Sequence, residues 1–198
     1  MIKNQNNQET TSSEINKYIQ NNNLHIVGFG GAGLNFVEFL HSKKINANFT
    51  CIKNPERPNL HSDINFIKFI YPINEILNFD FDISTQISEL FNKNENYILF
   101  SGLGGDTGAF LTVKIAKMLK EKKISFVSIS SLPFKFEHSV ENIFDPNTIA
   151  NSAKEQLKLF PNCYFFCLEE MKKSNKGVNL FNFFKITNEL IYNTIKSL

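Results

Sequence analysis

The chain has 198 residues, of which 42% are hydrophobic and 20% are charged, so it can bury the core of one domain, and disorder throughout is excluded. Its 21 basic and 19 acidic residues leave a net charge of +2, which is too balanced to indicate nucleic acid or a membrane surface as the main partner. No apolar run reaches the roughly 18–20 residues of a membrane helix, and the N-terminus has no signal-peptide core, so we expect a cytoplasmic protein without membrane insertion.

The three cysteines and four histidines do not predict a metal site. Cys51, Cys163 and Cys167 form neither a paired framework nor a ligand spacing, and they are interpreted as reduced thiols. The histidines stand apart from any cysteine or carboxylate at ligand spacing along the sequence. We therefore expect no metal-binding cluster of these residues.

Residues 1–22 are polar and lack periodicity, so they are predicted to form a flexible tail, followed by one domain over residues 23–198 that ends in a long helix. Apolar runs bounded by glycine, proline or polar residues predict strands, and amphipathic spacing predicts helices. In chain order, we expect strands at 24–29, 48–52, 64–70, 96–105, 124–130 and 163–168, alternating with helices from residue 33 onward and at 83–91, 109–122, 146–159 and 179–198. This alternation predicts an α/β fold whose parallel sheet is covered on both faces.

A glycine-rich loop, Gly28 to Gly33, follows the first expected strand and precedes a helix. Glycines let a phosphate approach the backbone, and the helix that follows directs free N–H groups and a positive dipole end toward an anion. The spacing also fits a dinucleotide site, which needs an acidic residue at the end of the second strand. That strand ends in Ile52-Lys53-Asn54 instead, which disfavours a dinucleotide-dependent oxidoreductase.

A second loop, Gly102-Leu103-Gly104-Gly105-Asp106-Thr107-Gly108, again joins a strand to a helix. A dinucleotide fold does not need a second glycine loop at this position. Neither loop is a Walker A sequence, because no Lys-Ser/Thr pair follows the glycines. Two such loops at neighbouring strand ends predict a site that holds different parts of one polyphosphate.

Three segments carry a resemblance to a known family: IVGFGGAGLNFVEF, YILFSGLGGDTGAFLTVKIAKMLKE and FVSISSLPFKFE. In this order they resemble the GTPase domain of FtsZ, the bacterial homologue of tubulin, from about residue 24 to 198. The resemblance implies a parallel-sheet, Rossmann-like tubulin/FtsZ nucleotide-binding domain, GTP or GDP with Mg²⁺ as ligand, FtsZ-like subunits or other division proteins as partners, and a role in bacterial cell division.

The resemblance also implies the roles of individual residues. Phosphate binding falls to the two glycine loops, ribose binding to Glu137, and guanine recognition to Asn188, with Phe184 one helical turn before it. The full set of implied nucleotide-binding residues is Gly31, Ala32, Gly33, Leu34, Asn35, Gly104, Gly105, Asp106, Thr107, Gly108, Glu137 and Asn188.

The sequence also departs from the family's pattern. Asp106 stands where the family's signature loop has its third glycine, and His138 to Glu141 lack the basic residue expected soon after Glu137. The glycine-rich γ-phosphate loop and the carboxylates of a second domain have no counterpart in this sequence. We therefore expect hydrolysis to be impaired or to depend on a partner, and no catalytic residue is assigned. The alternative hypothesis is an interaction protein on a tubulin-like fold that binds no nucleotide.

Overall fold

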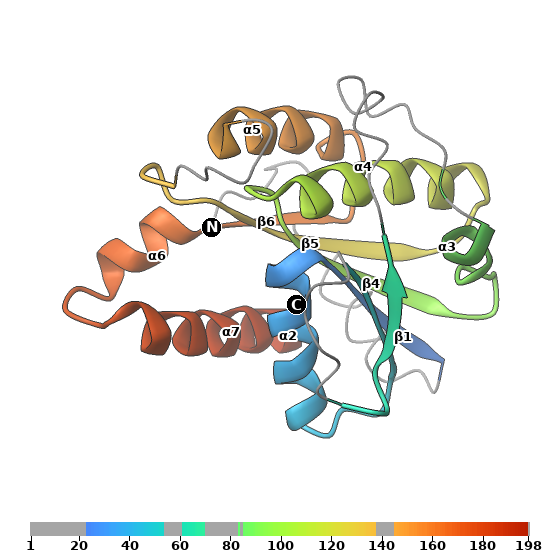
Figure 1. Cartoon of the computed structure of the whole chain (residues 1–198), viewed down its shortest axis with the longest axis horizontal. Coiled ribbons are helices and arrows are strands. Elements are labelled where there is room, and N and C mark those ends of the chain that lie inside the picture. Colours follow the sequence, from blue (N-terminus) through green and yellow to red (C-terminus); the bar gives the residue numbers. More distant parts are fainter. Residues whose placement is uncertain (1–22, 54–60, 70–82, 84, 138–144, 198) are drawn as a thin grey trace.

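A computed structural model of the chain describes residues 23–53, 61–69, 83, 85–137 and 145–197 (Figure 1). The tail predicted at 1–22 lies outside these ranges, as does the segment from His138 to Glu141. Among the described residues, no helix is both long and apolar enough to cross a membrane.

The core of the molecule is one six-stranded sheet with the strand order β3-β2-β1-β4-β5-β6. Every pair of neighbouring strands is parallel. The strands are β1 (Leu24–Phe29), β2 (Asn48–Lys53), β3 (Asn65–Lys68), β4 (Asn96–Gly102), β5 (Phe126–Leu132) and β6 (Cys163–Cys167). The predicted α/β class and parallel sheet are confirmed, with each strand close to its expected place.

Helices cover both faces of this sheet (Figure 1). They are α2 (Gly30–Ser42), α3 (Thr85–Glu89), α4 (Asp106–Glu121), α5 (Pro146–Leu157), α6 (Leu168–Ser174) and α7 (Leu180–Ser197). Ile26 of β1 packs in one cluster with Phe36 of α2 and Ile191 of α7. Its neighbour Val27 packs in a second cluster with Val113 of α4, which also includes side chains of α3 and α5. Successive strand residues thus point to opposite faces of the sheet. Each face packs against a different set of helices.

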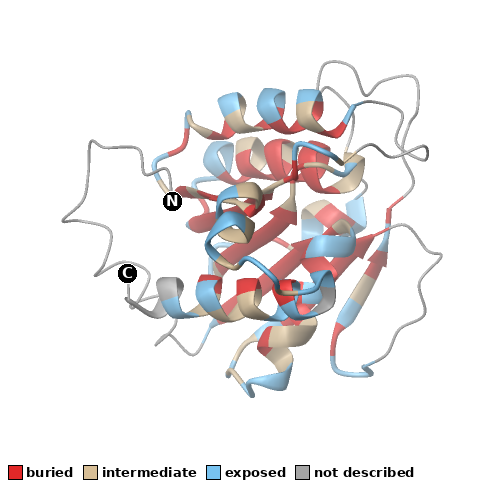
Figure 2. Cartoon of the chain, turned by 90° about the vertical axis from the view of Figure 1, so that its left-hand side faces the viewer, coloured by how far each residue is buried: buried red, intermediate tan, exposed pale blue. Residues whose placement is uncertain are grey.

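The continuous apolar character of the central strands follows from this double cover. All 6 residues of β1 are buried, and Figure 2 shows buried strands running between the helical layers. A strand that is covered on both faces reads as a nearly continuous apolar run instead of an alternation, and the sequence of β1, LHIVGF, is apolar at every position except His25. The apolar runs were therefore a reliable signal for these strands.

The chain reverses its direction across the sheet between β1 and β4. It passes from β1 outward to β2 and β3, and returns to place β4 on the other side of β1. The helices α2 and α4 consequently leave adjacent strand ends toward opposite faces of the sheet. Such a switch point opens a crevice at the carboxyl ends of the strands, which is where open α/β sheets bind ligands.

Two helices begin earlier than predicted, and one was not predicted. α2 begins at Gly30 instead of Gly33, and α4 begins at Asp106 instead of Ala109, so both glycine loops form the first helical turns themselves. The short helix α6 was missed because its sequence, LEEMKKS, is mostly charged. Its acidic first turn and basic last turn complement the helix dipole, which is a signal the apolar pattern does not contain.

Candidate functional site

A pocket of about 680 Å³ lies at the carboxyl ends of β1, β4 and β5 and extends to α7. It is therefore located at the switch point of the sheet. Most of the residues predicted for the site line it: Gly31, Ala32, Asn35, Gly104, Gly105, Asp106, Thr107, Gly108, Glu137 and Asn188. The other two predicted residues, Gly33 and Leu34, are buried and are not among its lining residues.

The first wall of the pocket is the turn from β1 into α2. Gly30 makes this turn with a φ of 68°, in the left-handed region that favours glycine. Phe29 occupies the N-cap position, and its side chain makes no capping hydrogen bond. The N–H groups of the first turn, from Gly31 onward, are of the kind that bind anions at helix N-termini.

The second wall is the turn from β4 into α4, where three glycines have different roles. A Cβ atom on Gly104 would lie 2.7 Å from Cβ of Pro133, and one on Gly108 would collide with the carbonyl oxygen of Gly102. Packing alone therefore requires glycine at both positions. A Cβ atom on Gly105, by contrast, would meet nothing within 4 Å, although this residue lines the pocket at the N-cap of α4. The missing side chain at Gly105 leaves backbone open to the pocket.

The two turns are in contact with each other. A Cβ atom on Gly30 would lie 3.3 Å from Cβ of Thr107 and 3.5 Å from the backbone nitrogen of Gly108. The N-termini of α2 and α4 therefore meet on one side of the pocket, and their positive dipole ends are directed to the same region. The N-cap residues of these two helices, Phe29 and Gly105, make no side-chain capping bond. In α5, by contrast, Asp145 accepts a hydrogen bond from the backbone N–H of Thr148 at 2.8 Å.

The opposite wall comes from α7, which places Phe184, Thr187, Asn188 and Ile191 along the pocket. Phe184 is 44% exposed, so part of its ring surface is accessible to a planar ligand. Thr187 is only 3% exposed, and its hydroxyl oxygen has no hydrogen-bond partner among the described residues. The spacing i, i+3, i+4 and i+7 is one face of a helix, and this signal would have identified Thr187 and Ile191 from the sequence.

Aromatic contacts and a hydrogen bond connect this wall to Glu137. Phe184 packs against Phe183 at a ring-centroid distance of 5.6 Å, and Phe183 packs against Phe134 at the same distance. The backbone N–H of Phe134 then donates a hydrogen bond to Glu137 Oε1 at 2.9 Å. The second oxygen, Oε2, would lie 3.4 Å from a Cβ atom on Gly104, so Glu137 is held beside the second turn.

Other lining residues sit at the ends of strands. Phe29, Gly30 and Gly102 belong to the two predicted glycine loops, whereas Phe100, Ser131 and Pro133 had no role assigned from the sequence. The position just at or after a strand end is the available signal, because parallel strands all point their carboxyl ends to one edge. Leu168, at the start of the unpredicted helix α6, completes the lining.

The charge of the pocket is unusual for a phosphate site. Among the described residues that line it, Asp106 and Glu137 carry carboxylates, and there is no lysine, arginine or histidine. Within the described lining, positive potential therefore comes from backbone N–H groups and helix dipoles. Asp106, the first residue of α4, places a negative charge at one of those two helix ends.

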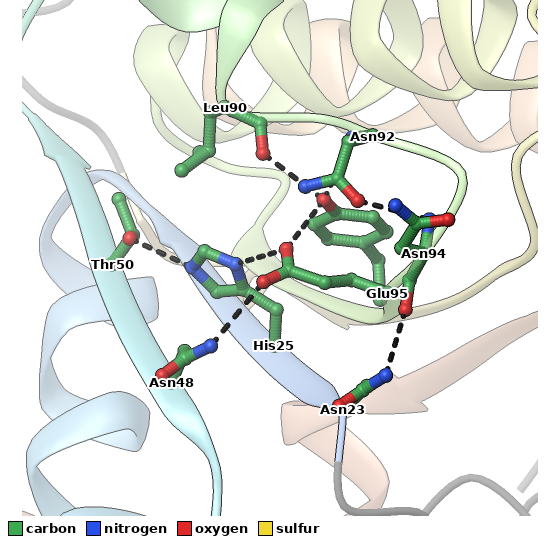
Figure 3. Close-up of polar contacts among 9 residues, drawn as sticks. Asn23, His25, Asn48, Thr50, Leu90, Asn92, Asn94 and Glu95 are labelled. Carbon is green, nitrogen blue, oxygen red and sulfur yellow. Dashed lines mark hydrogen bonds and ion pairs between the residues drawn. The ribbon is translucent and has the colours of Figure 1, made fainter.

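A second polar cluster lies near the amino ends of β1, β2 and β4, at the end of the strands opposite to the pocket (Figure 3). His25 Nδ1 lies 2.9 Å from the carboxylate of Glu95, and His25 Nε2 lies 2.9 Å from Oγ1 of Thr50. The hydroxyl of Tyr97 lies 2.7 Å from the same carboxylate oxygen of Glu95 and accepts a hydrogen bond from the backbone N–H of Asn92. A hydroxyl, a histidine and a carboxylate in this order can serve nucleophilic catalysis, but Thr50 is only 1% exposed, so no substrate reaches it. We assign this cluster a structural role.

Burial and hydrogen bonding act in opposite directions on the pKa of Glu95. Burial raises it, but hydrogen bonds from His25, Tyr97 and Asn48 together with the charge of His25 outweigh burial, so the pKa lies below its usual value. The pKa of Tyr97 is raised, chiefly by burial. Both groups thus keep their ordinary charge at neutral pH, with Glu95 ionised and Tyr97 protonated.

The cysteines and histidines form no metal site in the described part of the chain. Burial raises the pKa of both Cys51 and Cys163 to about 12, so these thiols are protonated at neutral pH and unreactive. Two histidines lie beside a carboxylate in the folded chain: His25 pairs with Glu95, and His41 pairs with Asp63. In both pairs the partners are far apart in the sequence.

Comparisons with known proteins establish the fold. No protein-family model and no curated protein match the sequence. Among solved structures, an empty FtsZ dimer of M. jannaschii matches 96% of this chain and 58% of that chain, with a TM-score of 0.67 and 20% sequence identity. A GDP-form TubZ protofilament of Bacillus thuringiensis serovar israelensis matches 93% of this chain and 57% of that one (TM-score 0.62, 14% identity). CetZ from Methanosaeta thermophila matches 85% and 51%, respectively (TM-score 0.58, 15% identity).

The fold is therefore that of the nucleotide-binding domain of the tubulin/FtsZ proteins, as the sequence predicted. The chain spans a little over half the length of these solved structures. At such low identity, the similarity concerns the fold, and the function has to be argued from the pocket.

Proposed function

We propose that this chain, which has the fold of the tubulin/FtsZ nucleotide-binding domain, binds GDP or GTP in the pocket between β1, β4 and α7. The observation that carries the proposal is the contact between the two glycine turns, Gly30 against Thr107, which brings the N-termini of α2 and α4 to one pocket. That arrangement supplies backbone N–H groups to more than one phosphate of a single ligand.

The residues that line the pocket fit a nucleotide. Gly31 and Ala32 on α2 and Gly104 to Gly108 on the second turn would hold the phosphates. Gly105 supports this assignment best, because its missing side chain leaves open space that no neighbouring atom fills. At about 680 Å³, the pocket is of the size typical of small-molecule sites.

The wall formed by α7 would hold the nucleoside. The amide of Asn188 has both donors and an acceptor for the edge of a purine, and Phe184 on the preceding turn offers a partly exposed ring for its face. Glu137, which is held beside Gly104, would accept hydrogen bonds from the ribose. We assign guanine rather than adenine from the position of Asn188 in the resemblance to FtsZ.

We propose that hydrolysis is slow or depends on a partner. Transfer of a phosphoryl group needs positive charge where negative charge develops, and no lysine or arginine lines the described part of the pocket. A bound Mg²⁺ would supply charge neutralisation to the phosphates. The remaining contribution would have to come from groups outside the described lining.

A role in bacterial cell division, in the cytoplasm and with FtsZ-like subunits or other division proteins, is part of the same proposal. It is supported by the fold, since the matching structures include an FtsZ dimer and a GDP-form TubZ protofilament. Light scattering with GTP and Mg²⁺ tests assembly directly: we expect no filaments from this chain alone, and robust assembly would contradict that expectation.

A second candidate function is an interaction protein on the same fold that binds no nucleotide. The observation that favours it is the composition of the pocket lining, which includes the carboxylates of Asp106 and Glu137 and, among the described residues, no lysine, arginine or histidine. Each carboxylate near a phosphate costs roughly 1–4 kcal/mol at 4 Å for effective dielectric constants between 80 and 20. The helix N-termini offset this cost only if the phosphates reach them.

Isothermal titration calorimetry of the purified chain separates the two functions. We expect GDP and GTP to bind in the micromolar range and ATP to bind at least about tenfold more weakly. If a folded protein shows no affinity for any guanine nucleotide, the nucleotide proposal is wrong and the interaction protein remains.

A further inference from the structure

We infer that the hydroxyl group of Thr187 forms a hydrogen bond with the nucleoside part of a bound nucleotide, a bond that the empty protein does not have. This inference rests on the proposed nucleotide site. It adds a residue of α7 to those that determine which ligand the pocket accepts, because a hydroxyl group can donate one hydrogen bond and accept others.

Thr187 is buried in the wall of the pocket, and its hydroxyl group is unpaired. The residue is 3% exposed and lines the pocket, between Phe184 and Asn188 on the same helix. Its hydroxyl oxygen has no hydrogen-bond partner among the described residues. Buried polar groups in folded proteins are nearly all hydrogen-bonded, so an unpaired hydroxyl group in a pocket wall points to a partner that arrives with the ligand.

A second buried threonine shows how a helix ordinarily satisfies this group. The hydroxyl group of Thr112 on α4 donates a hydrogen bond to the carbonyl oxygen of Gly108, four residues earlier. The same bond from Thr187 would go to the carbonyl oxygen of Phe183, and it is not formed. The packing of α7 therefore makes no use of the Thr187 hydroxyl group as a hydrogen-bond donor.

The position of Thr187 on α7 assigns its hydroxyl group to the nucleoside rather than to the phosphates. Thr187 directly precedes Asn188 and follows Phe184 by three residues, and these two are the residues proposed to contact the purine. The phosphates are proposed to lie against the turns into α2 and α4, at the opposite wall. The hydroxyl oxygen is buried in the empty protein, so the bond requires the side chain to turn about Cα–Cβ. Threonine in a helix divides between two such rotamers.

The hydroxyl group should have opposite effects on the empty protein and on the complex. Burial of an unpaired hydroxyl group is unfavourable. Thr187→Val replaces this group by a methyl group, so the melting temperature of the nucleotide-free variant should equal or exceed that of the wild type. With GDP, the same substitution leaves a polar atom of the ligand unpaired, so the dissociation constant should rise about tenfold. A purely structural role would change stability and affinity in the same direction.

Isothermal titration calorimetry with GDP and thermal unfolding without nucleotide measure the two effects. Thr85→Val is the matched control and should leave the affinity unchanged, because Thr85 is exposed on α3 and does not line the pocket. A second pair of variants does not depend on how valine packs. Thr187→Ser and Thr187→Ala both lose the methyl group, and only serine keeps the hydroxyl group. The dissociation constant of GDP should be about tenfold higher for Thr187→Ala than for Thr187→Ser.

The outcomes separate this inference from the proposed function. Equal GDP affinity of the wild type and a folded Thr187→Val, or of Thr187→Ser and Thr187→Ala, overturns the role of the hydroxyl group while nucleotide binding stands. If Thr187→Val is less stable than the wild type or does not fold, the comparison of serine with alanine decides. If the wild-type chain does not bind GDP, both proposals are wrong.

Discussion

Gly33 lies so close to Gly28 that a Cβ atom on Gly33 would stand 2.7 Å from the Gly28 carbonyl carbon. The same Cβ atom would lie 2.8 Å from the carbonyl oxygen of Phe100. Both neighbours are backbone atoms of the central strands β1 and β4, which cannot shift without disturbing the sheet. The last glycine of the first loop therefore serves the packing of α2 on the sheet, while Gly30 and Gly31 line the pocket.

Gly33→Ala should destabilise the protein by about 2 kcal/mol. The added methyl group meets backbone on two strands, and overpacking of this kind typically costs 1–3 kcal/mol. Alanine is preferred over glycine within a helix by about 1 kcal/mol, so the measured loss understates the steric cost. Urea unfolding followed by circular dichroism measures the free energy of unfolding. Gly105→Ala is the control: its methyl group enters open space, and a loss as large as that of Gly33→Ala would contradict this account.

Gly105→Val should weaken nucleotide binding at least tenfold without unfolding the protein. Gly105 has an extended backbone with φ −105° and ψ 144°, which valine adopts readily, and the space beside it is empty. The branched side chain would occupy the place proposed for a phosphate, so the dissociation constant of GDP should rise at least tenfold, or about 1.4 kcal/mol. Calorimetry gives the affinity and thermal unfolding verifies the fold. A folded variant that binds GDP normally would show that the phosphates do not meet the second turn.

The fold and the two walls of the pocket were largely predictable from the sequence. Doubly covered strands are continuous apolar runs, and the glycine loops are local features, so β1, β4 and the turns after them need no knowledge of distant residues. The first turns of α2 and α4 were not recognised as helical, because glycine and aspartate are poor helix formers. Their position between a buried strand and a packed helix overrides that preference.

The remaining features depend on contacts between distant parts of the chain. His25 and Glu95 are 70 residues apart, and no spacing rule connects them before the sheet brings β1 and β4 together. Gly33 was expected to contact phosphate, because the loop pattern does not distinguish a glycine that packs on a strand from one that faces a ligand. That distinction became visible only from the backbone atoms that a side chain would meet.

Asn188→Ala should weaken GDP binding by about tenfold and reduce the preference for GDP over ADP. The amide of Asn188 lines the pocket on α7, and loss of a hydrogen-bonding group that recognises a polar ligand typically costs 1–3 kcal/mol. Calorimetry with both nucleotides measures the affinity and the preference. Asn193→Ala is the matched control, because Asn193 is exposed on the same helix and does not line the pocket. Equal effects of the two substitutions would argue against base recognition by Asn188.

Glu95→Gln should make the stability of the protein less dependent on pH in the acid range. The hydrogen bonds from His25, Tyr97 and Asn48, with the charge of His25, outweigh burial and hold the pKa of Glu95 below its ordinary value. A carboxyl group whose pKa is lower in the folded state stabilises the protein above its unfolded pKa, and that contribution is lost as pH falls through the folded pKa. For the wild-type chain, the contribution of Glu95 should thus be complete above about pH 4.5 and decline below it.

Urea unfolding at pH 7, 5, 4 and 3 measures this dependence. Glu95→Gln keeps the size of the side chain but does not ionise, so its free energy of unfolding should be lower than that of the wild type at pH 7 and converge with it toward pH 3. Glu89→Gln, on the exposed surface of α3, is the control and should parallel the wild type throughout. The hydrogen bonds of Glu95 lie at the amino ends of the strands, whereas the pocket lies at their carboxyl ends. The GDP affinity at pH 7 should therefore be unchanged by Glu95→Gln. Parallel curves for Glu95→Gln and the wild type would show that the carboxylate does not stabilise the network.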